Sequence, residues 1–237
     1  MIVPVLTILF APQKFSSLFL VHLALGTSLA SIMFTSVSSF RSHHARGAVD
    51  WQVVRRITPG ILVGTFAGSW VAAQLSTRFL KEFFAAFLFF VAFQMFLNVR
   101  PKPSRQLPNT GGMFGVGGII GGISSLVGIG GGSISVPFLV WCNLSLHNAI
   151  GTSAAIGFPI ALAGAAGYLV NGVGVSGLPA YSLGFIYLPA LACISLASIC
   201  TAPLGARLAH RLPVSKLKKF FAIFLFVMGI KMLTTLW

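Results

Sequence analysis

Long apolar stretches dominate this sequence, and they leave few folds open to it. A helix that crosses a membrane needs about 20 consecutive, mostly apolar residues. Between the stretches lie short clusters of Lys and Arg, which are typical of the loops that flank a membrane. The pattern predicts an all-α polytopic membrane protein with crossings at roughly 23–40, 53–74, 80–99, 148–170, 182–204 and 217–236.

The composition excludes the main soluble classes. Only 8% of the 237 residues are charged and 56% are hydrophobic, whereas a soluble domain carries about a quarter charged residues. The net charge of +14 does not indicate nucleic-acid binding, because such proteins place basic side chains on a hydrated face between core positions. Three scattered cysteines indicate neither a disulfide framework nor a metal cluster. We expect the lipid bilayer as the surroundings, and no nucleic acid, metal or cofactor.

A glycine-rich run at 111–142 does not fit a single crossing. The run has 32 residues and no charge. One straight helix of that length would measure about 48 Å, well beyond the roughly 30 Å hydrocarbon layer. We expect a break at Gly128 to Gly132, because adjacent glycines end helices. The run then either crosses once with a kink or turns at the glycines and returns to its side of origin.

The distribution of basic residues favours the returning hairpin. If the run crosses once, Lys and Arg divide eight against eight across the membrane; if it returns, they divide twelve against four. Cytoplasmic loops carry the excess of Lys and Arg. We therefore predict that the basic loops 41–56, 100–105 and 207–219 are cytoplasmic.

The chain also repeats itself. Residues 22–30 align on 147–155 with six identities in nine positions, and residues 68–95 align on 205–232 with twelve in twenty-eight. Each repeat would comprise a glycine-broken hairpin and three transmembrane helices. That makes an odd number of passes, so the second repeat would be inverted relative to the first. Inverted repeats with broken helices are typical of secondary transporters.

The repeat sets the expected domain organisation. The first hairpin is incomplete, because its entering limb and glycine turn would precede Met1 and the chain opens at MIVPVL. The offset between the repeats grows from 125 to 137, through 130 at Gly47/Gly177 and Pro59/Pro189. We expect a first transmembrane repeat, a basic proline-containing linker and a second transmembrane repeat at 1–100, 101–110 and 111–237.

Three segments carry a family resemblance: GISSLVGIGGGSISVPFLV at 122–140, HNAIGTSAA at 147–155 and HLALGTSLASIMFTSVSSFRSHHARGAVDW at 22–51. They resemble the paired motifs of the TauE/SafE sulfite exporter family. The resemblance implies a secondary transporter, not an enzyme, that moves small anions such as sulfite, sulfoacetate or other sulfonates and organic acids across the cell membrane. Members normally begin with a first GIGGG segment like that at 128–132, which this chain lacks.

The GIGGG turn is the first candidate site. The half-helix that follows it would present unpaired amides, and helix N-termini bind anions through those amides and the helix dipole. We expect Gly130, Gly131, Gly132 and Ser133 to form part of the anion site. The alternative is that these glycines only permit close helix packing.

Two GTS elements are the second candidate. Their hydroxyls can donate to a sulfite or sulfonate oxygen without a buried charge, or they can bond to helix backbone instead. The expected substrate-binding residues are Gly26, Thr27, Ser28, Gly151, Thr152 and Ser153.

His22 and His147 occupy equivalent positions in the two repeats. Histidine titrates near neutral pH, so the pair is a candidate for coupling transport to the proton gradient; the alternative is that both only cap their helices. Two other functions fit the same residues. One is an anion channel, and the other is a non-transporting membrane scaffold.

Overall fold

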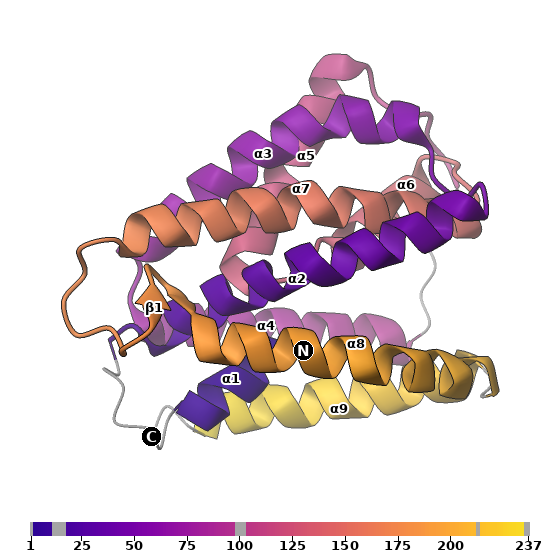
Figure 1. The fold of residues 1–237 in the computed structure, drawn as a ribbon. Helices are drawn as coiled ribbons and strands as arrows, with labels where there is room; N and C mark the ends of the chain where they lie inside the picture. Colours follow the sequence, from indigo (N-terminus) through magenta and orange to yellow (C-terminus); the bar gives the residue numbers. More distant parts are fainter. Residues whose placement is uncertain (1, 11–17, 98–102, 212–213, 235–237) are drawn as a thin grey trace.

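The computed structural model describes the backbone of residues 2–10, 18–97, 103–211 and 214–234, and their side chains except at 199–200 and 202–218. Figure 1 shows a mostly helical molecule with its long helices packed side by side. The helices are α1 (Ile2–Phe10), α2 (Leu20–Ala45), α3 (Trp51–Gln74), α4 (Thr77–Phe96), α5 (Thr110–Val127), α6 (Gly132–Trp141), α7 (Leu146–Gly172), α8 (Leu188–Arg211) and α9 (Val214–Thr234).

A small β-hairpin corrects the all-α prediction and the crossing expected to begin at residue 182. Strands β1 (Ser182–Leu183) and β2 (Ile186–Tyr187) pair antiparallel, and α8 begins only at Leu188. The tight turn has a physical cause, since Gly184 adopts a φ of +56°, which side chains other than glycine rarely tolerate.

Four described helices are long and apolar enough to cross a membrane: α2, α4, α5 and α7. They include three of the six predicted crossings. The crossing predicted at 53–74 forms the 24-residue helix α3, which is not among the four. Arg55, Arg56, Pro59 and Gln74 lower the mean hydropathy of this helix, and Gly60, Gly64 and Gly68 contribute little apolar character. The other two predicted crossings correspond to α8 and α9, whose side chains are described only in part.

The same glycines let α3 pack closely on α5. A Cβ atom at Gly60 would lie 2.0 Å from the carbonyl oxygen of Phe114, and one at Gly64 would lie 2.1 Å from that of Gly118. Small residues let helix backbones approach closely in membranes, where packing rather than the hydrophobic effect drives helix association. The glycines of α3 thus permit its close contact with α5.

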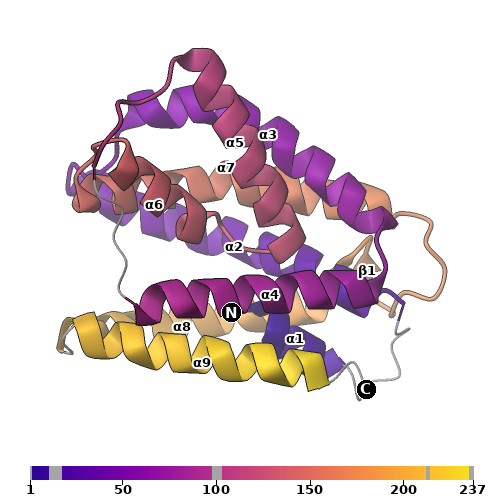
Figure 2. The same ribbon diagram turned by 180° about the vertical axis from the view of Figure 1, so that it is seen from behind.

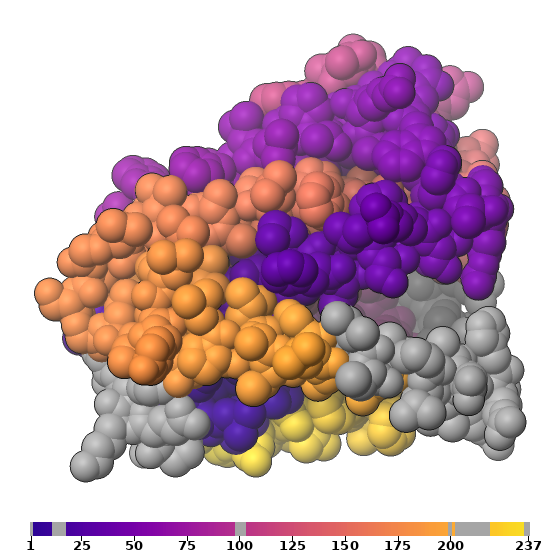
Figure 3. All heavy atoms as spheres, in the orientation of Figure 1, coloured from indigo at the N-terminus to yellow at the C-terminus, as the bar shows by residue number. Residues whose placement is uncertain are grey.

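Helices α2 and α7 form the centre of the molecule and run antiparallel. Gly26, near the start of α2, lies against Tyr168, near the end of α7. Ala48, just after α2, lies against Gly151, near the start of α7. Figure 3 shows the two helices in contact along one face of the molecule. The hydrophobic core includes Leu23, Leu25 and Leu29 of α2 and Ile156 of α7.

Two hydrogen bonds join the halves of the chain in matching positions. Thr27 Oγ1 on α2 accepts from the backbone N–H of Tyr187, two residues into the strand before α8, at 2.9 Å. Thr152 Oγ1 on α7 accepts from the backbone N–H of Asp50, directly before α3, also at 2.9 Å. Both threonine side chains are fully buried. The segment that leads into α3 is therefore anchored on α7, and the segment that leads into α8 is anchored on α2.

The two GTS glycines allow this contact. A Cβ atom at Gly26 would lie 2.3 Å from the carbonyl oxygen of Phe185, and one at Gly151 would lie 2.3 Å from that of Ala48. Real Cβ atoms essentially never come within 3.0 Å of a neighbour. Glycine is therefore required at both places by the approach of a backbone segment from the other half.

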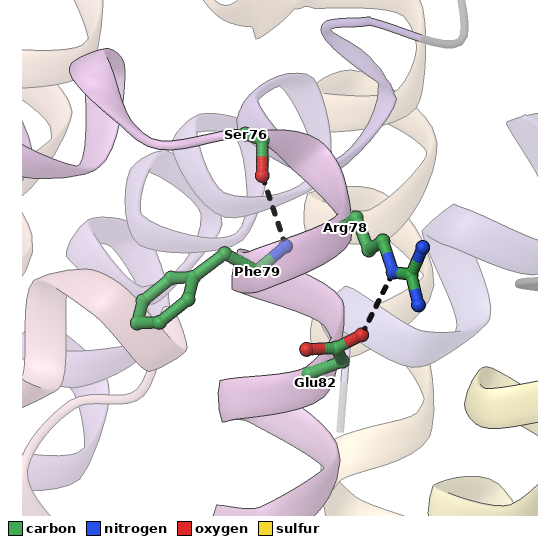
Figure 4. Close-up of polar contacts among 4 residues, drawn as sticks. All are labelled: Ser76, Arg78, Phe79 and Glu82. Carbon is green, nitrogen blue, oxygen red and sulfur yellow. Dashed lines mark hydrogen bonds and ion pairs between the residues drawn. The ribbon is translucent and has the colours of Figure 1, made fainter.

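Polar side chains begin α4 at the opposite end of α3. Ser76 Oγ accepts from the backbone N–H of Phe79 at 3.2 Å, which caps the helix. In the same turn, Arg78 Nε lies 3.0 Å from Glu82 Oε1, which is one turn further along α4 (Figure 4). Both side chains of this ion pair are exposed, so we expect it to add about 0.5 kcal/mol or less.

The glycine-rich run turns back on itself. Helix α5 ends at Val127, Gly128 and Gly131 have φ values of +64° and +77°, and α6 begins at Gly132 (Figure 2). The segment before the run meets the end of α6, because the backbone N–H groups of Ser104 and Arg105 donate to the carbonyl of Trp141, each at 3.2 Å. The chain thus breaks where the sequence predicts and returns to its starting end.

The described part of the basic clusters lies at that same end. Figure 1 places the end of α2, the start of α3, the end of α8 and the start of α9 together at one end of the molecule. The start of α4 and the end of α9 lie at the other end. The basic residues of 100–102 and 207–218 lie outside the described side chains. Those described at the basic end include Arg41, Arg46, Arg55, Arg56 and Arg105.

Replacing Thr27 or Thr152 by Val should destabilise the protein. Each change leaves a buried backbone N–H without its acceptor, which costs about 1–3 kcal/mol and should lower the apparent melting temperature in detergent by several degrees. Thr→Ser at either position keeps the hydroxyl and should retain most of the stability. If the Ser variants melt as low as the Val variants, the two hydrogen bonds are not what stabilises the contact.

The turn at the glycines predicts the sidedness of its two ends. In a background without the native cysteines, cells carrying Gln106→Cys or Asn143→Cys should react alike with a membrane-impermeant maleimide, and like Arg46→Cys. Ser176→Cys, which follows the far end of α7, should react from the opposite side. Opposite labelling of positions 106 and 143 would show that the run crosses the membrane once.

Candidate functional site

A cleft with several hydroxyls in its wall opens between α2, α6 and α7. Its volume is about 500 Å³. Hydroxyl side chains line it from two helices, with Thr35, Ser36 and Ser39 on α2 and Ser153 on α7. Gly130 and Gly132 line it from the glycine turn. No carboxylate is among the lining residues, so an anion in the cleft meets no like charge from its walls.

The start of α6 has unpaired donors beside this cleft. The backbone N–H groups of Ile134 and Ser135 both donate to the carbonyl of Gly131, at 3.0 and 2.9 Å. For the four preceding N–H groups, those of Gly130 to Ser133, the described part of the chain offers no hydrogen-bond acceptor. Consecutive unpaired amides at a helix start form a concave site that favours anions.

Ser124 adds a further donor behind the turn. Its side chain is 2% exposed, and its Oγ has no hydrogen-bond partner in the described residues. A Cβ atom built on Gly131 would lie 3.5 Å from this oxygen. A buried hydroxyl without a partner is unusual, because buried polar groups are nearly always hydrogen-bonded. Ser124 lies beside Gly131, and neither residue lines the cleft.

A hydroxyl pair links α6 to α7 at the cleft wall. Ser135 Oγ and Ser153 Oγ lie 2.6 Å apart, and Ser135 Oγ is also 2.9 Å from the carbonyl of Gly131. A hydroxyl has one proton to donate. While Ser135 donates to the carbonyl of Gly131, Ser153 donates to Ser135. The proton of Ser153 becomes available to a ligand in the cleft only if Ser135 donates to Ser153 instead.

The other GTS residues serve contacts between helices. Ser28 Oγ donates to the carbonyl of Gly128 at 2.9 Å, so the first GTS element fixes the glycine turn of the other half. Thr27 and Thr152 accept the backbone hydrogen bonds described above. Of the ten predicted substrate-binding residues, the cleft lining includes Gly130, Gly132 and Ser153, while Gly131, Ser133, Gly26, Thr27, Ser28, Gly151 and Thr152 lie outside it.

The two histidines predicted to be equivalent lie in different surroundings. His22 is 2% exposed, its Nε2 lies 3.0 Å from the carbonyl oxygen of Ala72, and its ring packs between Phe19 and Phe185. His147 is exposed at the start of α7. Neither lines the cleft.

One face of α2 was missed at the sequence level. Thr35, Ser39 and His43 follow one another at spacings of four residues, which places them on one side of a helix, and all three line the cleft. The signal was present in the sequence as a polar stripe in an otherwise apolar helix. The repeat did not reveal it, because the aligned segment ends at residue 30.

Comparison with known proteins identifies the family. The family described as "Sulfite exporter TauE/SafE" matches residues 1–232. A probable membrane transporter protein of Haemophilus influenzae is 38% identical over 232 residues, which is 98% of this chain and 88% of the relative. Probable membrane transporter proteins of Bacillus subtilis and Methanocaldococcus jannaschii are each 26% identical, over 86% and 98% of this chain and 81% and 86% of their own lengths. No solved structure matches. This chain, with its apolar helices and uncharged cleft, belongs to the TauE/SafE sulfite exporter family of membrane transporters and is not an enzyme.

Proposed function

We propose that this chain is a secondary transporter that moves a small anion across the cell membrane in step with a proton. Suitable substrates are sulfite, sulfoacetate and other sulfonates or organic acids. The observation that carries the proposal is the start of α6, where four consecutive amides without acceptors adjoin a cleft that has hydroxyls and no carboxylate.

The proposed site uses the chemistry of these donors. The amides of Gly130 to Ser133 and the hydroxyls of Ser124 and Ser153 would surround an oxyanion or sulfonate group. Neutral donors of this kind stabilise a negative charge through hydrogen bonds and dipoles. The lining includes no lysine or arginine, so no permanently charged side chain would hold the anion there.

We infer further that the two halves are inverted repeats. Matching helix contacts support this: α3 packs on α7 as α8 packs on α2, and α1 packs on α2 as α6 packs on α7. The crossed hydrogen bonds of Thr27 and Thr152 match in the same way. Two-fold related halves around a central pair of helices suit alternating access, in which one half rocks against the other. Thr27, Thr152, Gly26, Gly151 and Ser28 would then support the site.

We also propose that the basic end faces the cytoplasm. The described arginines of α2, α3 and the α5 linker gather there, as the excess of Lys and Arg on cytoplasmic loops requires. A cationic surface at the mouth of an uncharged cleft would raise the local concentration of anions.

Blocking the start of α6 tests the proposal. Gly132 is the suitable position, because a Cβ atom there would meet only Ser153 Oγ at 3.7 Å, an ordinary contact, and it lines the cleft. In proteoliposomes with an imposed pH gradient, the wild-type protein should show saturable sulfite or sulfoacetate flux. Gly132→Leu should reduce this flux at least about tenfold, a loss of about 1.4 kcal/mol or more, with an unchanged melting temperature.

Gly115→Leu is the matched control for that variant. It also introduces Leu in place of a helical glycine, but no atom lies within 4 Å of a Cβ atom at this position, so flux should stay normal. Unaltered flux in Gly132→Leu would contradict the proposed site. Flux that fails to saturate or ignores the pH gradient would indicate an anion channel, and no flux from folded wild-type protein would favour a scaffold.

A further inference from the structure

The cleft contains a single titratable side chain among its lining residues. The walls otherwise consist of the hydroxyls of Thr35, Ser36, Ser39 and Ser153 together with glycines and apolar side chains. His43, from the last turn of α2, is the exception. The charge of the cleft wall is therefore set by the protonation of one imidazole. Imidazole side chains ordinarily titrate near neutral pH.

His43 is held in place by its backbone while its ring nitrogen stays free. Its carbonyl accepts hydrogen bonds from the backbone N–H groups of Arg46 and Ala48, at 3.2 and 3.0 Å, which fixes the end of α2. Its Nδ1 is buried and has no hydrogen-bond partner in the described residues. The neighbouring His44 differs, because its Nδ1 accepts from Trp51 Nε1 at 3.1 Å and it does not line the cleft.

Few charged groups face His43. Arg46 comes from the end of its own helix, and His147 comes from the start of α7. Helices α5 and α6 contribute none, since Thr110–Val127 and Gly132–Trp141 contain no titratable side chain. The described residues of α2, α5, α6 and α7 include no carboxylate. An anion in the cleft would therefore supply the negative charge that these helices lack.

We propose that His43 binds a proton together with the anion, so that the occupied cleft holds an imidazolium and an anion of opposite charge. This inference rests on the proposed function of the cleft. The proton comes from the aqueous side and adds to a ring nitrogen of neutral His43, and no bond of the anion changes. Because the anion favours the imidazolium, the imidazolium favours the anion by the same factor. The pair is electrically neutral, and a neutral pair is less costly to enclose in a low-dielectric interior than a lone anion.

Binding of methanesulfonate to purified protein at several pH values tests this inference. A sulfonate remains ionised between pH 5.5 and 8.5, so any pH dependence belongs to the protein. For the wild-type protein the affinity should fall about fivefold or more as the pH rises across this range, the size of a typical coupling between two sites. In weakly buffered solution near pH 7, binding should also take up a proton.

His43→Gln should bind methanesulfonate with nearly the same affinity at every pH and without proton uptake. His43→Asn is the second variant, in case the longer amide disturbs the end of α2. His44→Gln is the matched control, since it removes the adjacent imidazole of the same helix, and it should behave like the wild-type protein.

Three results would overturn the inference. One is pH-dependent binding that survives in both folded His43 variants, and another is its loss in His147→Gln or His22→Gln alone. The third is wild-type binding that does not vary with pH, which would leave the proposed anion site intact. Folded wild-type protein that binds no anion at any pH would overturn the proposed function itself, and the inference with it.

Discussion

The structure depends on one constraint, which is that a chain can break its helix within a membrane protein only where other groups satisfy the exposed backbone. At the glycine turn, the carbonyl of Ser124 accepts from the backbone N–H groups of Gly128 and Ile129. Ser28, from the other half of the chain, donates to the carbonyl of Gly128. The amides that remain unpaired adjoin the cleft. Non-helical backbone at membrane depth is tolerated when it lines a cavity, so the proposed site and the helix break would have the same cause.

The same logic explains why each half anchors the other. A segment that leads from one long helix to the next has free backbone groups, and the hydroxyl of a threonine in the opposite half accepts one of them in each case. The glycine beside each threonine removes the side chain that would block the approach. The glycine and threonine of each GTS element therefore allow and stabilise the close approach of a backbone segment. The serine has a separate use in each half, since Ser28 fixes the turn and Ser153 lines the cleft.

The sequence predicts structural features that depend on neighbouring residues. It does not predict the contacts between segments that are far apart in the chain. Helix breaks and apolar spans follow from glycines and hydropathy, so the turn at Gly128 to Gly132 and three of the crossings were predicted. The contacts of Thr27 and Thr152 were not predicted, because their partners lie 160 and 102 residues away. The alignment also paired Pro59 with Pro189 at an offset of 130. In the structure, the two threonine hydrogen bonds place Asp50 and Tyr187 in equivalent positions, which are 137 residues apart. The first residues of α3 and α8 are also 137 residues apart.

The proposed role of His43 would explain why sequence repetition is a poor guide to the charged part of the binding site. Repeated residues such as the GTS elements mark positions with the same structural role in both halves, and packing between halves is such a role. A single substrate in a single cleft needs only one counter-charge, and a second equivalent one would add a charge that the anion does not balance. The residue that supplies it is therefore expected to lack a partner in the other repeat. His22 and His147 match in sequence but not in surroundings, whereas His43 lies in the cleft, beyond the aligned segment.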